Sequence, residues 1–416
     1  MSALIVEGGN PLRGSAHVHG AKNSVLPILA AVLLGDGVSV LRNCPQLSDV
    51  AASAEILRHL GCTVEMSGDA ICVDTAGLRC CDVPDELMRE MRSSVIFLGA
   101  ILGRMGCAEL SFPGGCELGP RPIDLHLSAL RALGAEIGER NGRLVCRGAY
   151  LKGADITLSL PSVGATENTM ICACAAAGKT VIRNAAREPE IEDLAAFLTA
   201  MGAQISGAGT STVVIQGGHR LTGADHRVMG DRIVAATYLA AAAATGGEVS
   251  LTGVEPEHVQ TVTELFRQAG CETDGQPGGV FLRAPSTLFS TAPVRTAPYP
   301  GFPTDAQAPV MAALCLSVGT TVFVENMFTN RYRHVPELSR MGADIRTEGR
   351  VAVVCGKSAL FGARVEAHDL RGGAALVVAA LAAKGKSEIK GIVHLDRGYE
   401  NLVECMQGLG GQIHRR

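Results

Sequence analysis

The chain has 416 residues, of which 47% are hydrophobic and 19% are charged, and its net charge is −4. This composition excludes a disordered chain and predicts about two to three domains with sizeable cores. It also argues against a general nucleic-acid binder, because such proteins carry a strongly basic face.

The N-terminal sequence MSALIVEGGN lacks the basic stretch and the long apolar core of a signal peptide. Apolar runs such as 25–34 and 374–383 are about ten residues long, which is too short to cross a membrane. The 14 cysteines show no C-x-x-C pair and no Cys/His spacing typical of zinc sites. We therefore expect a soluble cytoplasmic protein with free thiols, no metal site and no contact with membranes.

A short motif recurs six times, in the form of an apolar residue, Gly, a small residue, any residue and usually a β-branched one. Its copies begin at Leu60, Leu133, Met201, Ala269, Met341 and Leu409. The steps between copies are 73, 68, 68, 72 and 68 residues, which indicates an internal repeat of about seventy residues.

The elements within each copy follow the same order. First comes a helix that is apolar nearly all round and is expected to be buried, predicted at 24–34, 93–102, 168–177, 232–244, 307–316 and 373–383. A short strand follows, as at 38–41, 180–183, 248–251 and 321–324. An amphipathic helix such as 48–60 or 191–201 should then face outward and end at the Gly motif, before a strand pair such as 63–73.

Six βαβαβ-type units of this kind predict an α/β protein built from repeats. The last copy stops at Arg416 just after its Gly motif, whereas residues 3–20 read as paired strands around Gly8-Gly9-Asn10-Pro11. We expect these strands to complete the sixth unit, so that the chain ends meet. Three units per lobe then assign residues 22–229 to a first lobe and residues 1–21 plus 230–416 to a second, with a site in the cleft between them.

One loop combines several features of a reactive site. Cys116 follows two glycines and precedes Gly119-Pro120-Arg121-Pro122, a run that cannot continue a helix or a central strand. Most cysteines in such a chain are inert and buried. The nearby cation Arg121 and the pair Asp124 and His126 favour a reactive thiol here.

Cations occur at the predicted starts of the buried helices, namely Lys22, Arg92, Arg232 and Arg371. A cation at the positive end of a helix dipole is unfavourable by about 0.3–1 kcal/mol, so a bound anion would explain them. Helix capping explains Ser162 and part of the role of Asp305. Together with Arg121 and Arg397, the four cations at the helix starts indicate a site for a polyanionic small molecule.

The chain resembles a known family over its whole length. The segments GAKNSVLPILAA, GGCELGPRPIDLH, PSVGATENTM, GFPTDAQAP and LDRGYENL look like those of the UDP-N-acetylglucosamine 1-carboxyvinyltransferases, enolpyruvyl transferases of peptidoglycan precursor synthesis. The resemblance implies two inside-out α/β domains, each of three βαβαββ units. It also implies transfer of the enolpyruvyl group of phosphoenolpyruvate to the sugar 3-hydroxyl through a tetrahedral ketal, with phosphate release and no cofactor.

The resemblance also implies residue roles. Cys116 matches the proton donor, which can form a covalent adduct with phosphoenolpyruvate, and Asp305 matches the base near the sugar hydroxyl. Lys22 and Arg397 complete the expected catalytic set. The expected phosphoenolpyruvate contacts are Lys22, Asn23, Cys116, Arg121, Arg371 and Arg397. The expected UDP-N-acetylglucosamine contacts are Asn23, Arg92, Arg121, Pro122, Ile123, Asp124, Leu125, Ser162, Val163, Gly164, Thr304, Asp305 and Met327.

Some points stay open from the sequence. Many family members carry a lysine where this chain has Leu160 before Pro161, which puts one nucleotide contact in doubt. His126 is either a supporting group behind the nucleotide site or a purely structural histidine, and the oligomeric state is open. The sister enzyme acting on shikimate 3-phosphate lacks a loop cysteine of this kind. A nucleotide-sugar sensor or a repeat scaffold explains fewer of the polar residues.

Overall fold

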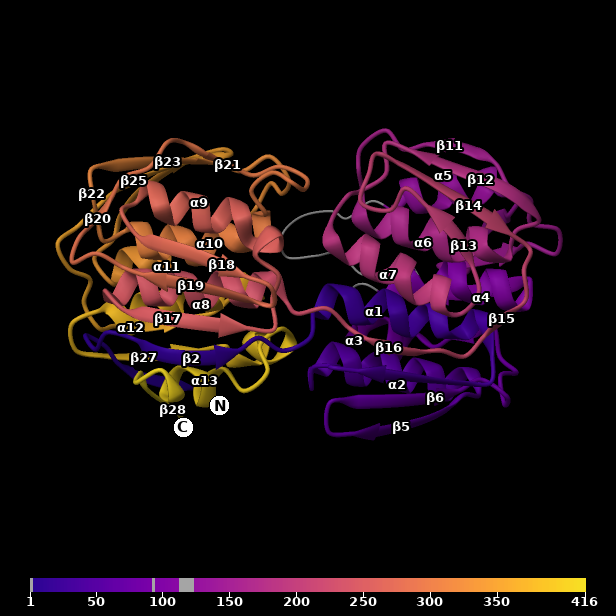
Figure 1. Ribbon diagram of the computed structural model, residues 1–416, viewed down its shortest axis with the longest axis horizontal. Helices are drawn as coiled ribbons and strands as arrows, with labels where there is room; N and C mark the ends of the chain where they lie inside the picture. Colours follow the sequence, from indigo (N-terminus) through magenta and orange to yellow (C-terminus); the bar gives the residue numbers. More distant parts are fainter. Residues whose placement is uncertain (1–2, 92–93, 112–122) are drawn as a thin grey trace. The chain divides into compact units, whose positions relative to one another are not determined.

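The computed structural model describes residues 3–91, 94–111 and 123–416 (Figure 1). Contacts divide these residues into two compact parts. We call residues 20–229 the first lobe, and residues 3–19 together with 230–416 the second lobe. The divisions fall at Gly20 and Gly230. No helix in the described part of the chain is long and apolar enough to cross a membrane.

Each lobe contains three buried helices, and their existence and burial confirm the sequence prediction. In the first lobe these are α1 (Lys22–Ala31), continued by the short 3₁₀ helix η1 (Val32–Leu34), α4 (Phe97–Met105) and α6 (Val163–Ala175). In the second lobe they are α8 (Arg232–Thr245), α10 (Thr304–Leu314) and α12 (Leu370–Ala382).

Several helix starts differ from the prediction. The helix predicted at 168–177 begins at Val163, because the polar residues Thr166 and Glu167 are buried within its first turns rather than in a loop. The helices predicted from 307 and 373 likewise begin about one turn earlier. The helix predicted at 93–102 is divided into a 3₁₀ turn, η2 (Ser94–Ile96), and α4.

The three buried helices of the first lobe run in the same direction. Near their C-terminal ends, Gly103 of α4 lies close to both Leu34 and Ala175. Near their starts, Gly99 of α4 lies against Asn168 of α6, where an added Cβ would come within 2.3 Å of Asn168 Oδ1. This close approach requires glycine, and it brings the first turns of α4 and α6 together.

Four-stranded sheets surround these helices in each lobe (Figure 1). The sheets of the first lobe are β16 (Asp225–Arg227), β4 (Val38–Arg42), β6 (Ala70–Asp74) and β5 (Thr63–Ser67); β7 (Asp82–Val83), β8 (Cys107–Ser111), β10 (Arg143–Arg147) and β9 (Glu136–Arg140); and β11 (Asp155–Thr157), β12 (Gly178–Arg183), β14 (Thr212–Gly217) and β13 (Gln204–Ser206). In every sheet the first pair of strands is parallel and the other two pairs are antiparallel.

The second lobe repeats this order of strands and directions. Its sheets are β2 (Arg13–His17), β17 (Glu248–Thr252), β19 (Gly279–Arg283) and β18 (Glu272–Gln276); β21 (Val294–Arg295), β23 (Thr320–Val324), β25 (Val351–Cys355) and β24 (Asp344–Glu348); and β26 (Arg364–Glu366), β27 (Lys386–Lys390), β1 (Leu4–Glu7) and β28 (Gln412–Arg415). Two strand pairs lie outside these sheets, β3 (Gly35–Asp36) with β15 (Leu221–Thr222) and β20 (Leu288–Phe289) with β22 (Ser317–Val318).

The second helix of each unit lies farther out and buries one face, as predicted. These helices are α2 (Ser48–Leu60), α5 (Asp124–Ala132), α7 (Pro189–Ala200), α9 (Gln260–Gln268), α11 (Val335–Arg340) and α13 (Leu402–Gly408). Further short helices are the α-helix α3 (Asp85–Glu90) and the 3₁₀ helices η3 (Pro256–Val259) and η4 (Ile392–Arg397). The six units thus form an inside-out α/β fold, with three units in each lobe.

The glycines of the repeated motif all have left-handed backbone conformations just after these outer helices. Their φ angles lie between +91° and +110° at Gly61, Gly134, Gly202, Gly270, Gly342 and Gly410. A residue with a side chain is strained there, which explains why the motif keeps glycine in every copy.

The two N-terminal strands correct one prediction, because they do not pair with each other. β1 lies between β27 and β28 and completes the sixth unit, whereas β2 pairs with β17 of the fourth unit. The chain between them is held by the end of α12 and the loop after it, since Gly9 N–H donates to Leu381 O and Gly8 N–H to Gly385 O. The chain ends do meet, through reciprocal backbone hydrogen bonds between Ala3 and Arg416 of 2.9 and 3.0 Å.

Two repeat glycines allow backbone strain to be separated from steric overlap. A Cβ at Gly61 would lie 2.3 Å from Gly77 O, whereas at Gly202 its nearest neighbour, Arg220 O, is 3.6 Å away. We expect Gly202→Ala to lower the free energy of unfolding by about 1–2 kcal/mol through strain alone, and Gly61→Ala by about 3 kcal/mol or more. Equilibrium denaturation of both variants measures this, and equal losses would contradict the steric contribution.

Candidate functional site

In the first lobe, Lys22 is the first residue of α1 and forms an ion pair of 2.8 Å with Asp49. Both side chains are buried, with exposed fractions of 10% and 3%. Asp49 lies in the first turn of α2, so a carboxylate of the protein balances the cation that the sequence places at the helix start. Asn23, the next residue, is exposed.

Asp193 of α7 holds this end of α1 in place. Its carboxylate accepts hydrogen bonds from Ser24 Oγ and from Met229 N, and it lies 2.9 Å from His226 Nε2. The first turn of α1 is thereby joined to α7, β16 and the last residues of the first lobe. Sequence reasoning missed Asp193, because the repeat pattern does not show which outer-helix carboxylate points inward.

The start of α6 carries Ser162-Val163-Gly164. Ser162 caps this helix, as predicted, by accepting a hydrogen bond from Ala165 N. Val163 and Gly164 occupy its first turn and are partly exposed. Ile123 immediately precedes α5, Asp124 is its exposed first residue, and Leu125 is half-buried.

His126 lies behind the start of α6. A Cβ added to Gly164 would lie 3.1 Å from the His126 ring, and His126 Nδ1 is 3.1 Å from Asn168 Nδ2. Asn168 Oδ1 already accepts from Gly99 N, so Asn168 Nδ2 donates and His126 Nδ1 accepts. Burial lowers the pKa of His126 to about 4, despite the opposing charge of Asp124. A neutral His126 therefore supports the α6 start from within the lobe.

Glu167 is a buried carboxyl group that sequence reasoning also missed. Burial raises its pKa well above the ordinary range, and the charges of Glu190 and Glu188 act in the same direction. Its Oε1 has no hydrogen-bond partner among the described residues. Burial thus favours the protonated form of Glu167, which lies just over one turn after the Ser162 cap.

In the second lobe, Asp305 lies between two buried arginines. Arg331 Nη2 is 2.7 Å from Asp305 Oδ1 and also donates to Thr304 O, while Arg371 Nη2 is 3.3 Å from Asp305 Oδ2. Each arginine side chain is only 3% exposed, and that of Asp305 is 30% exposed. Two guanidinium groups thus stabilise the ionised carboxylate. Arg331 is a third residue that the motif search missed.

The capping prediction for Asp305 is wrong. Asp305 lies in the first turn of α10, and no side chain caps that helix. The caps of the other two buried helices are Asp231, which accepts from Ile233 N and Val234 N, and Asp369, which accepts from Arg371 N and Gly372 N. Asp305 is therefore available for a role other than capping.

Arg371 also connects α12 to its neighbours. Its Nη1 donates to Tyr399 OH at 3.2 Å, and that hydroxyl is 2.8 Å from Thr237 Oγ1 on α8. Arg397, the last residue of η4, is half-buried, and the following Gly398 lies against Leu370 at the start of α12. Arg397 and Arg371 thus belong to the same end of the lobe.

Glu325 fixes two of the predicted sugar-site residues. Its carboxylate is 1% exposed and accepts from Thr304 Oγ1, Thr296 Oγ1 and Met327 N at 2.8–3.0 Å. Met327 itself is 40% exposed. A single buried carboxylate therefore sets the positions of Thr304 and Met327, a role that the sequence pattern did not indicate.

Four predicted residues, Arg92, Cys116, Arg121 and Pro122, lie outside the described residues. Leu160, the residue that puts one predicted nucleotide contact in doubt, is 53% exposed. Arg232 is 8% exposed and its guanidinium lies 5.7 Å from the centre of the Tyr299 ring. Within the described ranges, no group of three or more His, Cys, Asp or Glu residues could hold a metal ion.

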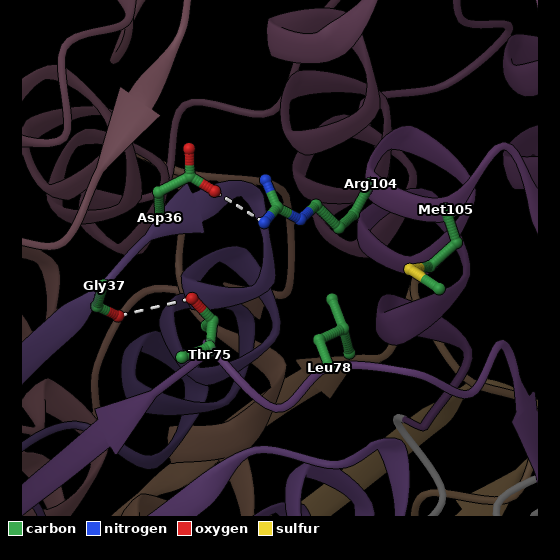
Figure 2. A pocket seen from close by; sticks show the side chains of 7 residues that line it. Asp36, Gly37, Thr75, Leu78, Arg104 and Met105 are labelled. Carbon is green, nitrogen blue, oxygen red and sulfur yellow. Dashed lines mark hydrogen bonds and ion pairs between the residues drawn. The ribbon is translucent and has the colours of Figure 1, made fainter.

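One pocket of about 430 Å³ lies elsewhere in the first lobe (Figure 2). It is lined near the C-terminal ends of η1 and α4 by Asp36, Thr75, Leu78, Arg104 and Met105, and it contains none of the predicted site residues. Asp36 pairs with Arg104 at 2.6 Å and with Arg220 at 3.0 Å. Hydrogen bonds from these two arginines lower the pKa of Asp36, so they stabilise its ionised form.

The neutral state of His126 predicts a pH dependence of folding. Its pKa of about 4 in the folded chain lies below about 6.5 in an unfolded chain, so the unfolded state binds the proton more tightly. We expect the wild type to lose up to about 3 kcal/mol more stability than His126→Gln between pH 7 and pH 4. Denaturation at several pH values checks this, and parallel pH profiles would contradict it.

Comparison with known proteins adds independent evidence. The sequence profile of EPSP synthase (3-phosphoshikimate 1-carboxyvinyltransferase) matches residues 6–406. The chain is 48% identical to UDP-N-acetylglucosamine 1-carboxyvinyltransferase 2 of Caldanaerobacter subterraneus subsp. tengcongensis, with 100% of both chains covered. It is 44% identical to UDP-N-acetylglucosamine 1-carboxyvinyltransferase of Myxococcus xanthus, which covers 100% of this chain and 99% of the relative.

Solved structures share the fold. The enolpyruvyl transferase NikO from Streptomyces tendae matches with a TM-score of 0.89 at 24% identity, covering 100% of this chain and 98% of NikO. EPSP synthase from Acinetobacter baumannii matches with a TM-score of 0.76 at 20% identity, covering 100% of both chains. The repeats, the charged helix starts and the full-length similarity agree, and the chain belongs to the UDP-N-acetylglucosamine 1-carboxyvinyltransferases, within the wider family of EPSP synthase.

Proposed function

We propose that this protein transfers the enolpyruvyl group of phosphoenolpyruvate to the 3-hydroxyl of UDP-N-acetylglucosamine, releasing phosphate, as the first committed step of peptidoglycan precursor synthesis. The observation that carries the proposal is full-length identity of 48% to a relative named for this activity. The wider family profile names a different acceptor, shikimate 3-phosphate, but the relatives that share 44–49% of their residues with this chain are all named for the nucleotide sugar.

The substrates explain the need for so many cations. Phosphoenolpyruvate carries a phosphate and a carboxylate, and the nucleotide sugar adds a diphosphate. We assign phosphoenolpyruvate binding to Lys22, Asn23, Cys116, Arg121, Arg371 and Arg397. Support comes from Lys22 and Arg371, cations that lie at the starts of buried helices, where the positive end of the helix dipole also favours anions.

The addition step requires two proton transfers. The 3-hydroxyl oxygen forms a bond to C2 of phosphoenolpyruvate, its proton leaves to a base, and a proton is added at C3. We assign the base to Asp305, which Arg331 and Arg371 stabilise as a carboxylate, the form that accepts a proton. We assign the donor to Cys116. Loss of a proton from C3 and cleavage of the C2–O bond then release phosphate from the ketal.

The nucleotide sugar would contact helix starts in the same way. We assign its binding to Asn23, Arg92, Arg121 to Leu125, Ser162 to Gly164, Thr304, Asp305 and Met327. Support comes from Glu325, which orders Thr304 and Met327, and from His126, which packs behind Gly164. The exposed Leu160 contributes no charge to this site.

We place the reaction in the cytoplasm, because both substrates are multiply charged phosphate compounds that do not cross a membrane unaided. The proposed chemistry needs no metal or prosthetic group, since positioned side chains supply both protons and charge stabilisation.

Phosphate release tests the proposal directly. With phosphoenolpyruvate present, we expect release with UDP-N-acetylglucosamine as acceptor and none with shikimate 3-phosphate, and a fall of about 10²-fold or more in Cys116→Ala. Release with shikimate 3-phosphate would assign the chain to the sister activity. Tight binding of the nucleotide sugar without release would indicate a sensor.

The arginines around Asp305 predict a graded effect on turnover. Asp305→Asn removes the proton acceptor while keeping its shape, and we expect kcat to fall about 10²–10⁴-fold with a smaller change in KM. Arg331→Met leaves Asp305 with less positive charge nearby, so the acidic limb of the pH–rate profile should move to higher pH. Arg340→Met, at an arginine that is 65% exposed on α11, is the matched control and should leave the profile unchanged. An unmoved profile in Arg331→Met would contradict the role of Arg331.

A further inference from the structure

Two cysteines in the first lobe face each other across neighbouring strands. Cys107 is the first residue of β8, and Cys81 immediately precedes β7. Their Sγ atoms are 3.0 Å apart, both thiols are free, and both residues are half-buried. Neither residue belongs to the site described above.

The backbone places the two residues one step out of register on adjacent strands. β7 and β8 are parallel neighbours that pair Asp82 with Glu109, and Glu109 N–H donates to Cys81 O at 2.9 Å. Cys81 therefore precedes this pair by one residue and Cys107 by two. Neighbouring strands lie about 4.8 Å apart and one residue advances a strand by about 3.3 Å, so the two Cα atoms are about 6 Å apart, within the range that a disulfide spans. The two sulfur atoms need to approach by only about 1 Å to reach the bond length of about 2.05 Å.

We propose that Cys81 and Cys107 form a reversible redox pair, which peroxides convert into an intramolecular disulfide joining β7 to β8. The proposal concerns oxidation of the protein and stands apart from the enolpyruvyl transfer reaction. It assigns a modification site to two residues that are not among the predicted substrate contacts.

The chemistry balances with hydrogen peroxide as the oxidant. The Cys107 thiolate attacks one peroxide oxygen and the O–O bond breaks, which gives a sulfenic acid and one molecule of water after proton uptake. The Cys81 sulfur then attacks the Cys107 sulfur, its proton leaves, and the hydroxyl departs as a second molecule of water. Two thiols are thus oxidised to one disulfide, and the peroxide is reduced to water.

The order of attack follows from the environment of Cys81. Burial raises the pKa of Cys81 to about 12, and contact with Cys107 adds to this effect. Burial therefore disfavours the Cys81 thiolate, so Cys107 is taken to be oxidised first and Cys81 to resolve the sulfenic acid, and the opposite order gives the same disulfide. Cys80 is half-buried beside Cys81, which makes it a matched control.

The cross-link would close a loop between positions that are 26 residues apart. That loop contains α3, η2 and α4, and α4 packs against α6 within the lobe. Restricting the unfolded chain in this way stabilises the folded lobe, so we expect its melting temperature to rise by about 5 °C on oxidation.

The experiment uses the full chain, as wild type and as Cys116→Ser, the latter to remove a competing thiol. After brief treatment with hydrogen peroxide, remaining thiols are blocked with N-ethylmaleimide, and a digest without reductant is analysed by mass spectrometry. We expect a cross-linked peptide joining Cys81 to Cys107 with the mass of two hydrogen atoms missing. Dithiothreitol should reverse both the cross-link and the rise in melting temperature.

Single variants define the pair. Cys80→Ser should form the same cross-link as the wild type, whereas Cys81→Ser and Cys107→Ser should lose it together with the thermal shift. A disulfide from Cys80 to Cys107 would overturn the assignment, and so would alkylation of both Cys81 and Cys107 after peroxide treatment. These results come from peptide masses, so they do not depend on whether the protein turns over phosphoenolpyruvate.

Discussion

Burial of three apolar helices in each lobe along most of their length is the constraint on which the rest of the structure depends. Side chains along α10 from Ala306 to Leu314 are all buried, so polar groups can reach solvent only at its first turn. The same holds for α12, where burial extends from Arg371 to Leu381. Because the helices run side by side, their polar starts gather at one end of the lobe. A fold built this way concentrates charge without disturbing its core.

In both lobes, the charged side chains at these helix starts form ion pairs with oppositely charged side chains of the protein. Lys22 has Asp49, and Asp305 has Arg331 and Arg371, with distances of 2.7–3.3 Å. Buried cations that faced one another unpaired would repel and would be costly to desolvate. Pairing them with carboxylates keeps each guanidinium or ammonium in a fixed geometry, so the proposed anion site consists of groups that are already oriented. Preorganised charge of this kind contributes to catalysis without reorganisation during the reaction.

The regular parts of the fold could be predicted from the sequence because they depend on local patterns. The Gly motif marks a left-handed residue after each outer helix, and apolar composition marks each buried one. The pairing of β1 and β2 could not be predicted, since strand partners hundreds of residues away compete with the adjacent strand and nothing local decides between them. For the same reason the contacts of Asp193, Glu325 and Arg331 could not be predicted from the sequence. Each acts through contacts of single residues that no repeated pattern marks.

The position of β1 also has a consequence for how the protein is made. β1 has one neighbour in β27 and the other in β28, whose pairing runs to Arg415, and β2 needs β17. The first lobe, by contrast, is one continuous stretch of chain between these elements. During synthesis that lobe can fold as soon as it leaves the ribosome, while the first seventeen residues wait without partners. The sixth sheet of the second lobe can close only after β28 has followed β1 out of the ribosome, so the second lobe completes its fold after the first.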